Sequence, residues 1–153
     1  MWAHITVIYS FRDSARIDAE TVQAIESVLA SFERFDFALT TVECFRNPQV
    51  VLYLAPEPAA PFKAMTNAFA MEFTDTPPYG GVFDEFIPHV QVADEEDVEI
   101  RATIEADVGP HLPIEATTGE VELVEHGPDG WRLRRSFRLA NSSPRGRFTA
   151  STP

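Results

Sequence analysis

The sequence contains a single cysteine, Cys44, and this scarcity excludes two classes of site. One thiol cannot form an internal disulfide, and a structural zinc centre built on four cysteines is excluded as well. The sequence also lacks an apolar run long enough to cross a bilayer, and it lacks a charged and then apolar leader. We therefore expect a cytoplasmic protein that makes no contact with a membrane.

Basic residues are scarce, with 12 lysines and arginines against 24 acidic residues and a formal net charge of −12. All 24 acidic residues lie in residues 1–131, whereas six of the 12 basic residues are arginines of residues 132–153. An acidic body repels long polynucleotides, because their affinity depends on the neutralisation of many phosphates. The arginines either tether the last strand to the acidic surface or supply a local field for a small ligand with one or two phosphates.

Hydrophobic residues make up 44% of the 153 residues, which is enough for the core of one globular domain. Alternating or continuous apolar patterns predict strands at residues 1–11, 35–39, 50–54, 86–93, 114–125 and 131–139. Helices are predicted after Asp18, from Pro61 and after residues 94–97. The order of elements repeats roughly at half the chain and favours an α+β fold, with two pseudo-symmetric lobes of antiparallel sheet and outer helices around a central cleft. We assign residues 1–140 to this domain and residues 141–153 to a flexible tail.

Each half of the chain contains one apolar strand pattern with a histidine and a polar residue on the same face. Alternate residues of a strand share a face, so His4 accompanies Thr6 and His89 accompanies Gln91. If the two strands lie side by side, two imidazoles and two polar groups meet in one cleft, which suits proton transfer at a phosphate. A lone histidine on a strand is more often a hydrogen-bonded core or edge residue. His111 and His126 lie in turn-like surroundings, and we interpret both as surface residues.

These motifs resemble the 2H phosphoesterases, the group of 2′-5′ RNA ligases and cyclic phosphodiesterases that carry two His-x-Thr/Ser motifs. His4-Ile5-Thr6-Val7 matches the first motif, and Pro88-His89-Val90-Gln91-Val92-Ala93 matches the second with glutamine in place of the hydroxyl residue. Val51-Leu52-Tyr53-Leu54-Ala55-Pro56 and the longer block from Pro77 to Phe86 add to the likeness. The resemblance extends over nearly all of residues 3–139.

Two departures from the family pattern stand out. Gln91 lacks a hydroxyl, although its amide NH₂ can still donate to a phosphate oxygen. His4 lies almost at the start of the sequence, whereas relatives have a strand and a loop before this motif. We expect either a truncated start or a sheet that lacks an N-terminal edge strand, and a homodimer is one way to cover such an edge.

The resemblance implies a metal-independent phosphodiesterase that needs no cofactor. Its implied partner is a small phosphate-containing substrate or RNA end, with hydrolysis of a cyclic phosphate (2′,3′-cyclic nucleotide or RNA end) or of a 2′-5′ linkage. His4 and His89 are its implied acid and base, and Thr6 and Gln91 are expected to bind the non-bridging phosphate oxygens. Two aromatic residues near the expected cleft, Tyr79 and Phe11, are candidates for stacking on a base, and the alternative for both is packing in the core.

Two other functions remain open from the sequence. Gln91 could mark a nucleotide-binding or cyclic-phosphate-binding module that does not turn its ligand over. A metal site could instead form from His4, His89 and either Asp84 or Glu85, since two histidines and a carboxylate can hold a catalytic metal. The His-x-Thr pattern gives the metal site no support.

Overall fold

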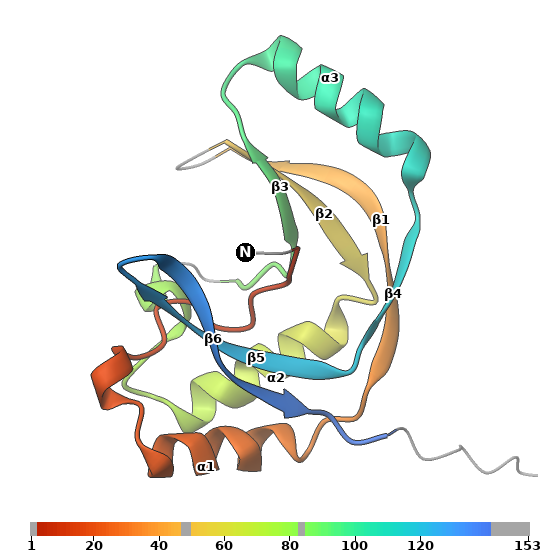
Figure 1. Ribbon diagram of the computed structural model, residues 1–153. Coiled ribbons are helices and arrows are strands. Elements are labelled where there is room, and N and C mark those ends of the chain that lie inside the picture. The colour runs from red at the N-terminus through yellow and green to blue at the C-terminus, as the bar shows by residue number, and fades with distance from the viewer. Residues whose placement is uncertain (1–2, 47–49, 83–84, 142–153) are drawn as a thin grey trace, which may run out of the picture.

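Six strands and three helices are formed by residues 3–46, 50–82 and 85–141, the part of the chain that the computed structural model describes (Figure 1). The helices are α1 (Ala19–Leu29), α2 (Ala60–Glu72) and α3 (Val98–Val108), and short 3₁₀ turns lie at Ser14–Arg16, Pro78–Gly81 and Gly109–His111. The strands are β1 (Phe35–Phe45), β2 (Val51–Glu57), β3 (Val90–Asp94), β4 (Ile114–Thr118), β5 (Glu120–Gly127) and β6 (Gly130–Arg138).

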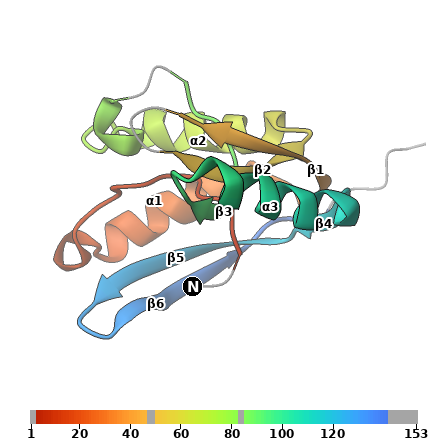
Figure 2. The same ribbon diagram turned by 90° about the horizontal axis from the view of Figure 1, so that it is seen from above.

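The strands form two antiparallel sheets, and this confirms the predicted α+β class. The larger sheet has four strands in the order β3-β2-β1-β4, and the smaller sheet is the β5–β6 hairpin. Figure 2 shows α2 along the β1–β2 part of the large sheet and α1 along the hairpin. Among the described residues, none of the helices is long and apolar enough to cross a membrane.

The large sheet has a hydrophobic face that packs on α2. Phe35 and Phe37 alternate along β1, and both rings meet the ring of Phe62 from α2, at centroid distances of 5.0 and 5.1 Å. Leu52 and Leu54 alternate in the same way along β2 and are buried. Successive strand residues point to opposite faces. The residues that alternate with these phenylalanines along β1 and with these leucines along β2 therefore form a second, more polar face.

A second hydrophobic cluster joins α1, α2 and the hairpin. Its buried members come from all three elements: Ile25, Leu29, Met65, Phe69, Phe73, Phe137 and Leu139. In β6 the apolar Phe137 lies between exposed residues, so only one face of the hairpin is covered by α1 and α2. This cluster fixes the hairpin against the helices.

The predicted N-cap Asp18 is confirmed, and Asp97 of the predicted acidic start caps α3. The Asp18 carboxylate accepts a hydrogen bond from Thr21 N at 2.8 Å, and α1 begins at Ala19, the residue after Asp18. The Asp97 carboxylate accepts from Glu99 N and Ile100 N at the start of α3. These bonds satisfy amides that have no partner within the first helical turn, which is why the two helices begin there.

The strand predicted for residues 1–11 is wrong for the described residues 3–11, which have no strand pairing. Their backbone bonds to other elements instead: Val7 O accepts from the Thr66 hydroxyl, and Tyr9 O accepts from Tyr79 N. Ser10 has a φ of 42°, a left-handed conformation that no strand contains. The apolar pattern of this segment reflects contact with the core and not membership of a ladder.

Further strand predictions had wrong boundaries: β1 and β2 extend beyond their predicted ends at residues 39 and 54, to Phe45 and Glu57. The second histidine strand begins at Val90, so His89 lies just before the ladder, and β3 pairs with β2 only. The strand predicted for residues 114–125 is divided at Gly119 between the two sheets. The two histidine segments therefore do not pair as neighbouring strands among the described residues. The predicted tail at residues 141–153 lies, after Asn141, outside the described residues.

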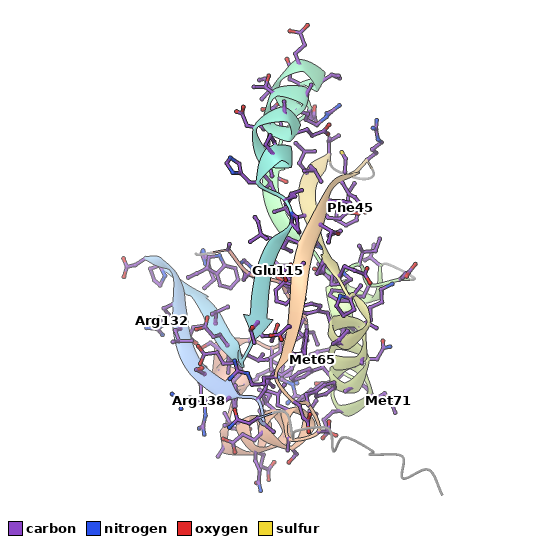
Figure 3. All side chains as sticks on the ribbon, turned by 90° about the vertical axis from the view of Figure 1, so that its right-hand side faces the viewer. Phe45, Met65, Met71, Glu115, Arg132 and Arg138 are labelled. Atoms are coloured by element: carbon purple, nitrogen blue, oxygen red, sulfur yellow. The ribbon has the colours of Figure 1, made fainter. Side chains whose placement is uncertain are left out.

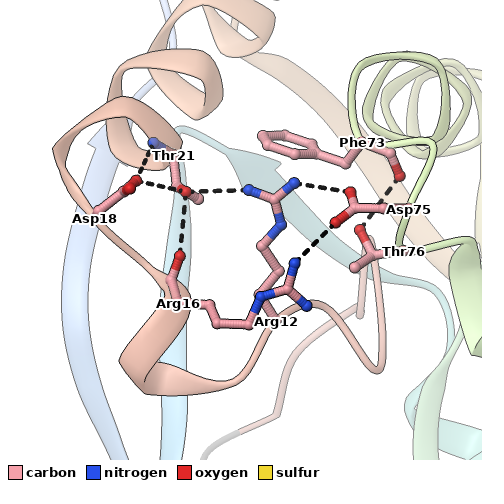
Figure 4. A network of polar contacts seen from close by, with 7 residues as sticks. All are labelled: Arg12, Arg16, Asp18, Thr21, Phe73, Asp75 and Thr76. Atoms are coloured by element: carbon pink, nitrogen blue, oxygen red, sulfur yellow. Dashed lines mark hydrogen bonds and ion pairs between the residues drawn. The ribbon is translucent and has the colours of Figure 1, made fainter.

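A network of polar contacts connects Arg12 and Arg16, which precede α1, to α1 itself and to the residues that follow α2 (Figure 4). The Arg12 guanidinium donates to the Thr21 hydroxyl at 3.1 Å and to the Asp75 carboxylate at 2.7 Å. Arg16 reaches the other oxygen of Asp75 at 3.2 Å. The hydrogen bond from Arg12 is the main reason why the pKa of Asp75 lies below its usual value near 3.8.

Asp75→Asn should lower stability at neutral pH and also lower the sensitivity of the protein to acid. A carboxyl whose pKa is depressed by folding stabilises the native state above its unfolded pKa, and this contribution disappears as the pH falls through its folded pKa. The difference in unfolding free energy between wild type and Asp75→Asn should therefore shrink below about pH 4. Urea denaturation from pH 7 to pH 3 measures this difference. Asp107→Asn, which removes an exposed carboxylate outside the network, is the control.

Candidate active site

His4 belongs to the N-terminal segment, residues 3–11, where it is exposed and Thr6 is half-buried. Figures 1 and 2 both place the start of this segment close to the start of β3. Farther along, Val7 and Ile8 pack against the hydrophobic cluster. The bond from the Thr66 hydroxyl of α2 to Val7 O, at 2.8 Å, fixes the backbone at this point. The segment is thus anchored through its middle while its first residues approach β3.

His89 is half-buried and immediately precedes β3. Its Nδ1 lies 2.7 Å from Ile87 O. Because a carbonyl oxygen can only accept, we assign the proton in this contact to Nδ1. Nε2 is then the nitrogen that can accept a proton from a ligand or, in the imidazolium, donate one.

Two aromatic rings of the large sheet contact the His89 imidazole. The ring of Phe45 is 5.1 Å from it and that of Tyr53 is 5.4 Å from it, at interplanar angles of 82° and 63°. The two aromatic rings also stack on each other at 4.1 Å. Perpendicular and offset arrangements of this kind are favourable for aromatic side chains.

Glu43, Tyr53 and Gln91 form a row across three strands on the polar face of the large sheet. Tyr53 lies opposite Glu43 of β1 and opposite Gln91 of β3. The Tyr53 hydroxyl donates to the Glu43 carboxylate at 2.7 Å, and burial together with this bond raises the pKa of the phenol. Gln91 is exposed. The predicted common face of His89 and Gln91 thus also contains a tyrosine and a carboxylate.

The two candidate stacking residues have different surroundings. Phe11 is half-buried, and its ring meets Phe73 edge to face at 4.9 Å within the hydrophobic cluster. Tyr79 is also half-buried, has a φ of 52°, and lies 5.8 Å from the exposed Tyr9 ring. Burial raises the pKa of Tyr79. The structure does not bring Phe11 to His89, whose ring contacts come from Phe45 and Tyr53.

Several arginines of β6 form ion pairs with other elements. Arg134 donates to Ile17 O at 2.7 Å and to the Glu125 carboxylate at 3.1 Å, and Arg132 also pairs with Glu125. A hydrogen bond from Ser14, followed by the contacts with these arginines, lowers the pKa of Glu125. Arg135 pairs with Glu26 of α1. The contacts of these three arginines match the interpretation that they tether the last strand to the acidic surface.

No group of three or more histidine, cysteine, aspartate or glutamate side chains could hold a metal ion within residues 3–46, 50–82 and 85–141. Glu85, one of the considered ligands, instead accepts a bond from Lys63 at 2.6 Å, and this bond lowers its pKa. Asp84, the other considered carboxylate, lies outside the described residues.

Sequence reasoning missed Phe45 and Tyr53 as ring neighbours of His89, and Glu43 as the partner of the Tyr53 hydroxyl. Tyr53 was part of a segment that resembled the family, but no role was assigned to it. Phe45 and Glu43 lie at the end of β1, beyond the strand that was predicted for residues 35–39. The hydrophobic alternation weakens there because Thr40 and Thr41 coincide with a β-bulge.

The comparison with known families matches most of the chain. The model of the 2′-5′ RNA ligase superfamily matches residues 1–130 of the 153 residues. The chain belongs to the 2′-5′ RNA ligase superfamily. No curated protein matches the sequence significantly.

Membership of the 2′-5′ RNA ligase superfamily confirms the family resemblance and indicates enzymes of the phosphoesterase and ligase type. The matched residues include both histidine motifs, with Thr6 after the first histidine and Gln91 after the second. The match ends at the start of β6, so the arginines of that strand lie outside it.

Proposed function

We propose that this member of the superfamily is a metal-independent phosphodiesterase with two-histidine acid–base catalysis. Its substrates are a cyclic phosphate, such as a 2′,3′-cyclic nucleotide or RNA end, or a 2′-5′ linkage. The observation that carries the proposal is the orientation of His89, whose Nδ1 contacts Ile87 O and whose Nε2 is therefore the nitrogen for proton transfer. The superfamily match over both histidine motifs supports the same chemistry.

The proposed reaction on a cyclic phosphate uses one imidazole as a base and the other as an acid. The neutral imidazole takes a proton from water while the water oxygen bonds to phosphorus. The bond from phosphorus to the 2′ or 3′ oxygen breaks, and the imidazolium gives its proton to that oxygen. The products are a phosphate monoester and a free hydroxyl. His4 and His89 perform these two steps in the proposal, in an order that depends on which oxygen leaves.

Thr6 and Gln91 are the proposed donors to the non-bridging phosphate oxygens. Donors directed at charge that develops in the transition state contribute strongly to catalysis in a site that excludes water. The Gln91 amide supplies two N–H groups, where a hydroxyl supplies one O–H group. Its position opposite Tyr53 in the ladder supports a role on the same face as His89.

Purified wild-type protein should hydrolyse a 2′,3′-cyclic nucleotide or a 2′-5′ dinucleotide, and a chelator should not lower the rate. A 3′-5′ dinucleotide, which is neither cyclic nor 2′-5′ linked, is the control substrate. Product monoesters are followed by chromatography. Loss of turnover with chelator, at unchanged protein stability, contradicts the two-histidine mechanism.

The second candidate function is a binding module for a nucleotide or cyclic phosphate, and Gln91 is the residue that favours it. In that case the same ligands bind saturably and remain intact over hours. Gln91→Thr restores the hydroxyl of the family motif and should then produce turnover. For an active wild type we expect Gln91→Thr to remain active, since both histidines are unchanged.

A further inference from the structure

The His89 imidazole has little backbone support of its own. It precedes the first residue of β3, so the strand ladder does not fix it. The contact between its Nδ1 and Ile87 O is the hydrogen bond that orients the ring. The torsion that turns an imidazole about its Cβ–Cγ bond has broad, roughly two-fold preferences. Rotation about this bond exchanges the positions of a ring nitrogen and a ring carbon, and it displaces Nε2.

Phe45 and Tyr53 limit this rotation by contact. The two rings stack on each other with an interplanar angle of 21°, and the imidazole meets them at 82° and 63°. A ring that turned within this space would move its edge toward one of the two aromatic faces. The contacts therefore favour one plane of the His89 ring, and the hydrogen bond from Nδ1 to Ile87 O selects between the two orientations within that plane.

The aromatic pair is itself held in place. Tyr53 is 4% exposed and lies in the second strand of the large sheet, with a hydrogen-bonding partner at its hydroxyl, the Glu43 carboxylate. Phe45 lies opposite Val51 in the last residue pair of β1 and β2. The pair on the sheet gives the imidazole a fixed surface to pack against.

We propose that Phe45 and Tyr53 are positioning residues that hold the His89 imidazole in the orientation in which Nδ1 donates to Ile87 O and Nε2 is available for proton transfer. The kinetic part of this inference rests on the proposed phosphodiesterase function. The structural part concerns the imidazole alone and does not depend on turnover.

The decisive measurement is nitrogen-15 NMR of the neutral His89 ring in wild type, Phe45→Leu and Tyr53→Leu. In the wild type, a protonated Nδ1 and a bare Nε2 should give two well-separated resonances. In both leucine variants the two resonances should move toward each other, because the ring samples a second orientation and tautomer. Tyr53→Phe keeps the ring and loses only the hydroxyl, so its spectrum should stay close to that of the wild type.

The kinetic arm measures kcat and KM for a 2′,3′-cyclic nucleotide in the same variants. Misplacement of a catalytic group acts on the chemical step, so kcat should fall about 10- to 100-fold in the leucine variants while KM changes about twofold or less. Phe37→Leu is the matched control, because it removes a ring from the same strand on the face that packs on Phe62. It should leave both the spectrum and kcat near the wild-type values.

Unchanged His89 resonances in both folded leucine variants overturn the inference, whatever the activity. If Tyr53→Leu does not fold, the spectrum of Phe45→Leu alone tests the inference. Phe45 is only half-buried, so its replacement should disturb folding less. A wild type without turnover counts against the proposed function alone, and the NMR comparison still decides whether the aromatic pair orients His89.

Discussion

His4→Ala and His89→Ala should each lower kcat for cyclic-phosphate hydrolysis by about 10²- to 10⁴-fold, the range expected for the loss of a general acid or base. Each substitution removes one of the two proton transfers, and water must then replace the imidazole. KM should change much less, because the phosphate oxygens keep their proposed donors. Steady-state kinetics with a 2′,3′-cyclic nucleotide provide the test.

The double variant should be about as slow as the slower single variant. Two groups that act in one concerted step are not additive, since the loss of either already prevents the coupled transfer. Fully multiplicative losses would indicate that the histidines act in separate steps or at separate sites. The double variant therefore tests the shared site that the two motifs predict.

The other two histidines provide matched controls. His111 is exposed in the 3₁₀ turn after α3, and His126 is exposed in β5 beside Trp131, at a ring distance of 5.2 Å. His111→Ala and His126→Ala should keep kcat within about twofold of the wild type, because distant surface substitutions act weakly. Turnover that survives both His4→Ala and His89→Ala, or that disappears in His111→Ala, contradicts the assignment.

Helix starts and the fold class could be predicted because their causes are local. Asp18 caps α1 through the amide of a residue three positions later, and the apolar spacing of the helix appears in the same short window. The succession of strand and helix patterns then limits the architecture to few choices. The antiparallel pairing of β1 with β2 follows from their short connection.

The N-terminal segment could not be predicted in the same way. Several of its apolar residues are partly buried, in keeping with the pattern, but Val7 and Ile8 pack on a cluster formed by α1, α2 and the hairpin. Periodicity records which side of a segment is buried. It does not record whether the backbone carbonyl groups accept from a strand, from the Thr66 hydroxyl or from a loop. That choice depends on residues far away in the sequence.

The candidate site could be predicted in part for the same reason. The histidines and their polar neighbours are visible in short motifs, and the superfamily match covers them. The rings around His89 come from two other strands, 44 and 36 positions earlier in the chain. Contacts across strands depend on register, and a bulge such as the one between Leu39 and Thr41 changes register without a clear local signal.

Met65→Ala should lower the free energy of unfolding by about 2–5 kcal/mol, the usual range when a large buried side chain is truncated. Met65 is 1% exposed and belongs to the cluster that joins α1, α2 and the hairpin. Truncation leaves a cavity, because the neighbouring phenylalanines of α2 and β6 are fixed by their own packing. A domain of this size has about 5–15 kcal/mol of stability, so the loss is a large fraction of the total.

Met71→Ala is the matched control for this prediction. Met71 lies on the same helix but is 81% exposed, and Figure 3 shows its label at the outer side of α2 and that of Met65 at the inner side. Both substitutions make the same change in helix propensity, so the difference between them isolates burial. Met71→Ala should change stability by about 0.5 kcal/mol or less. Equal urea midpoints for the two variants would contradict the burial of Met65, and with it the cluster that holds the N-terminal segment through Val7 and Ile8.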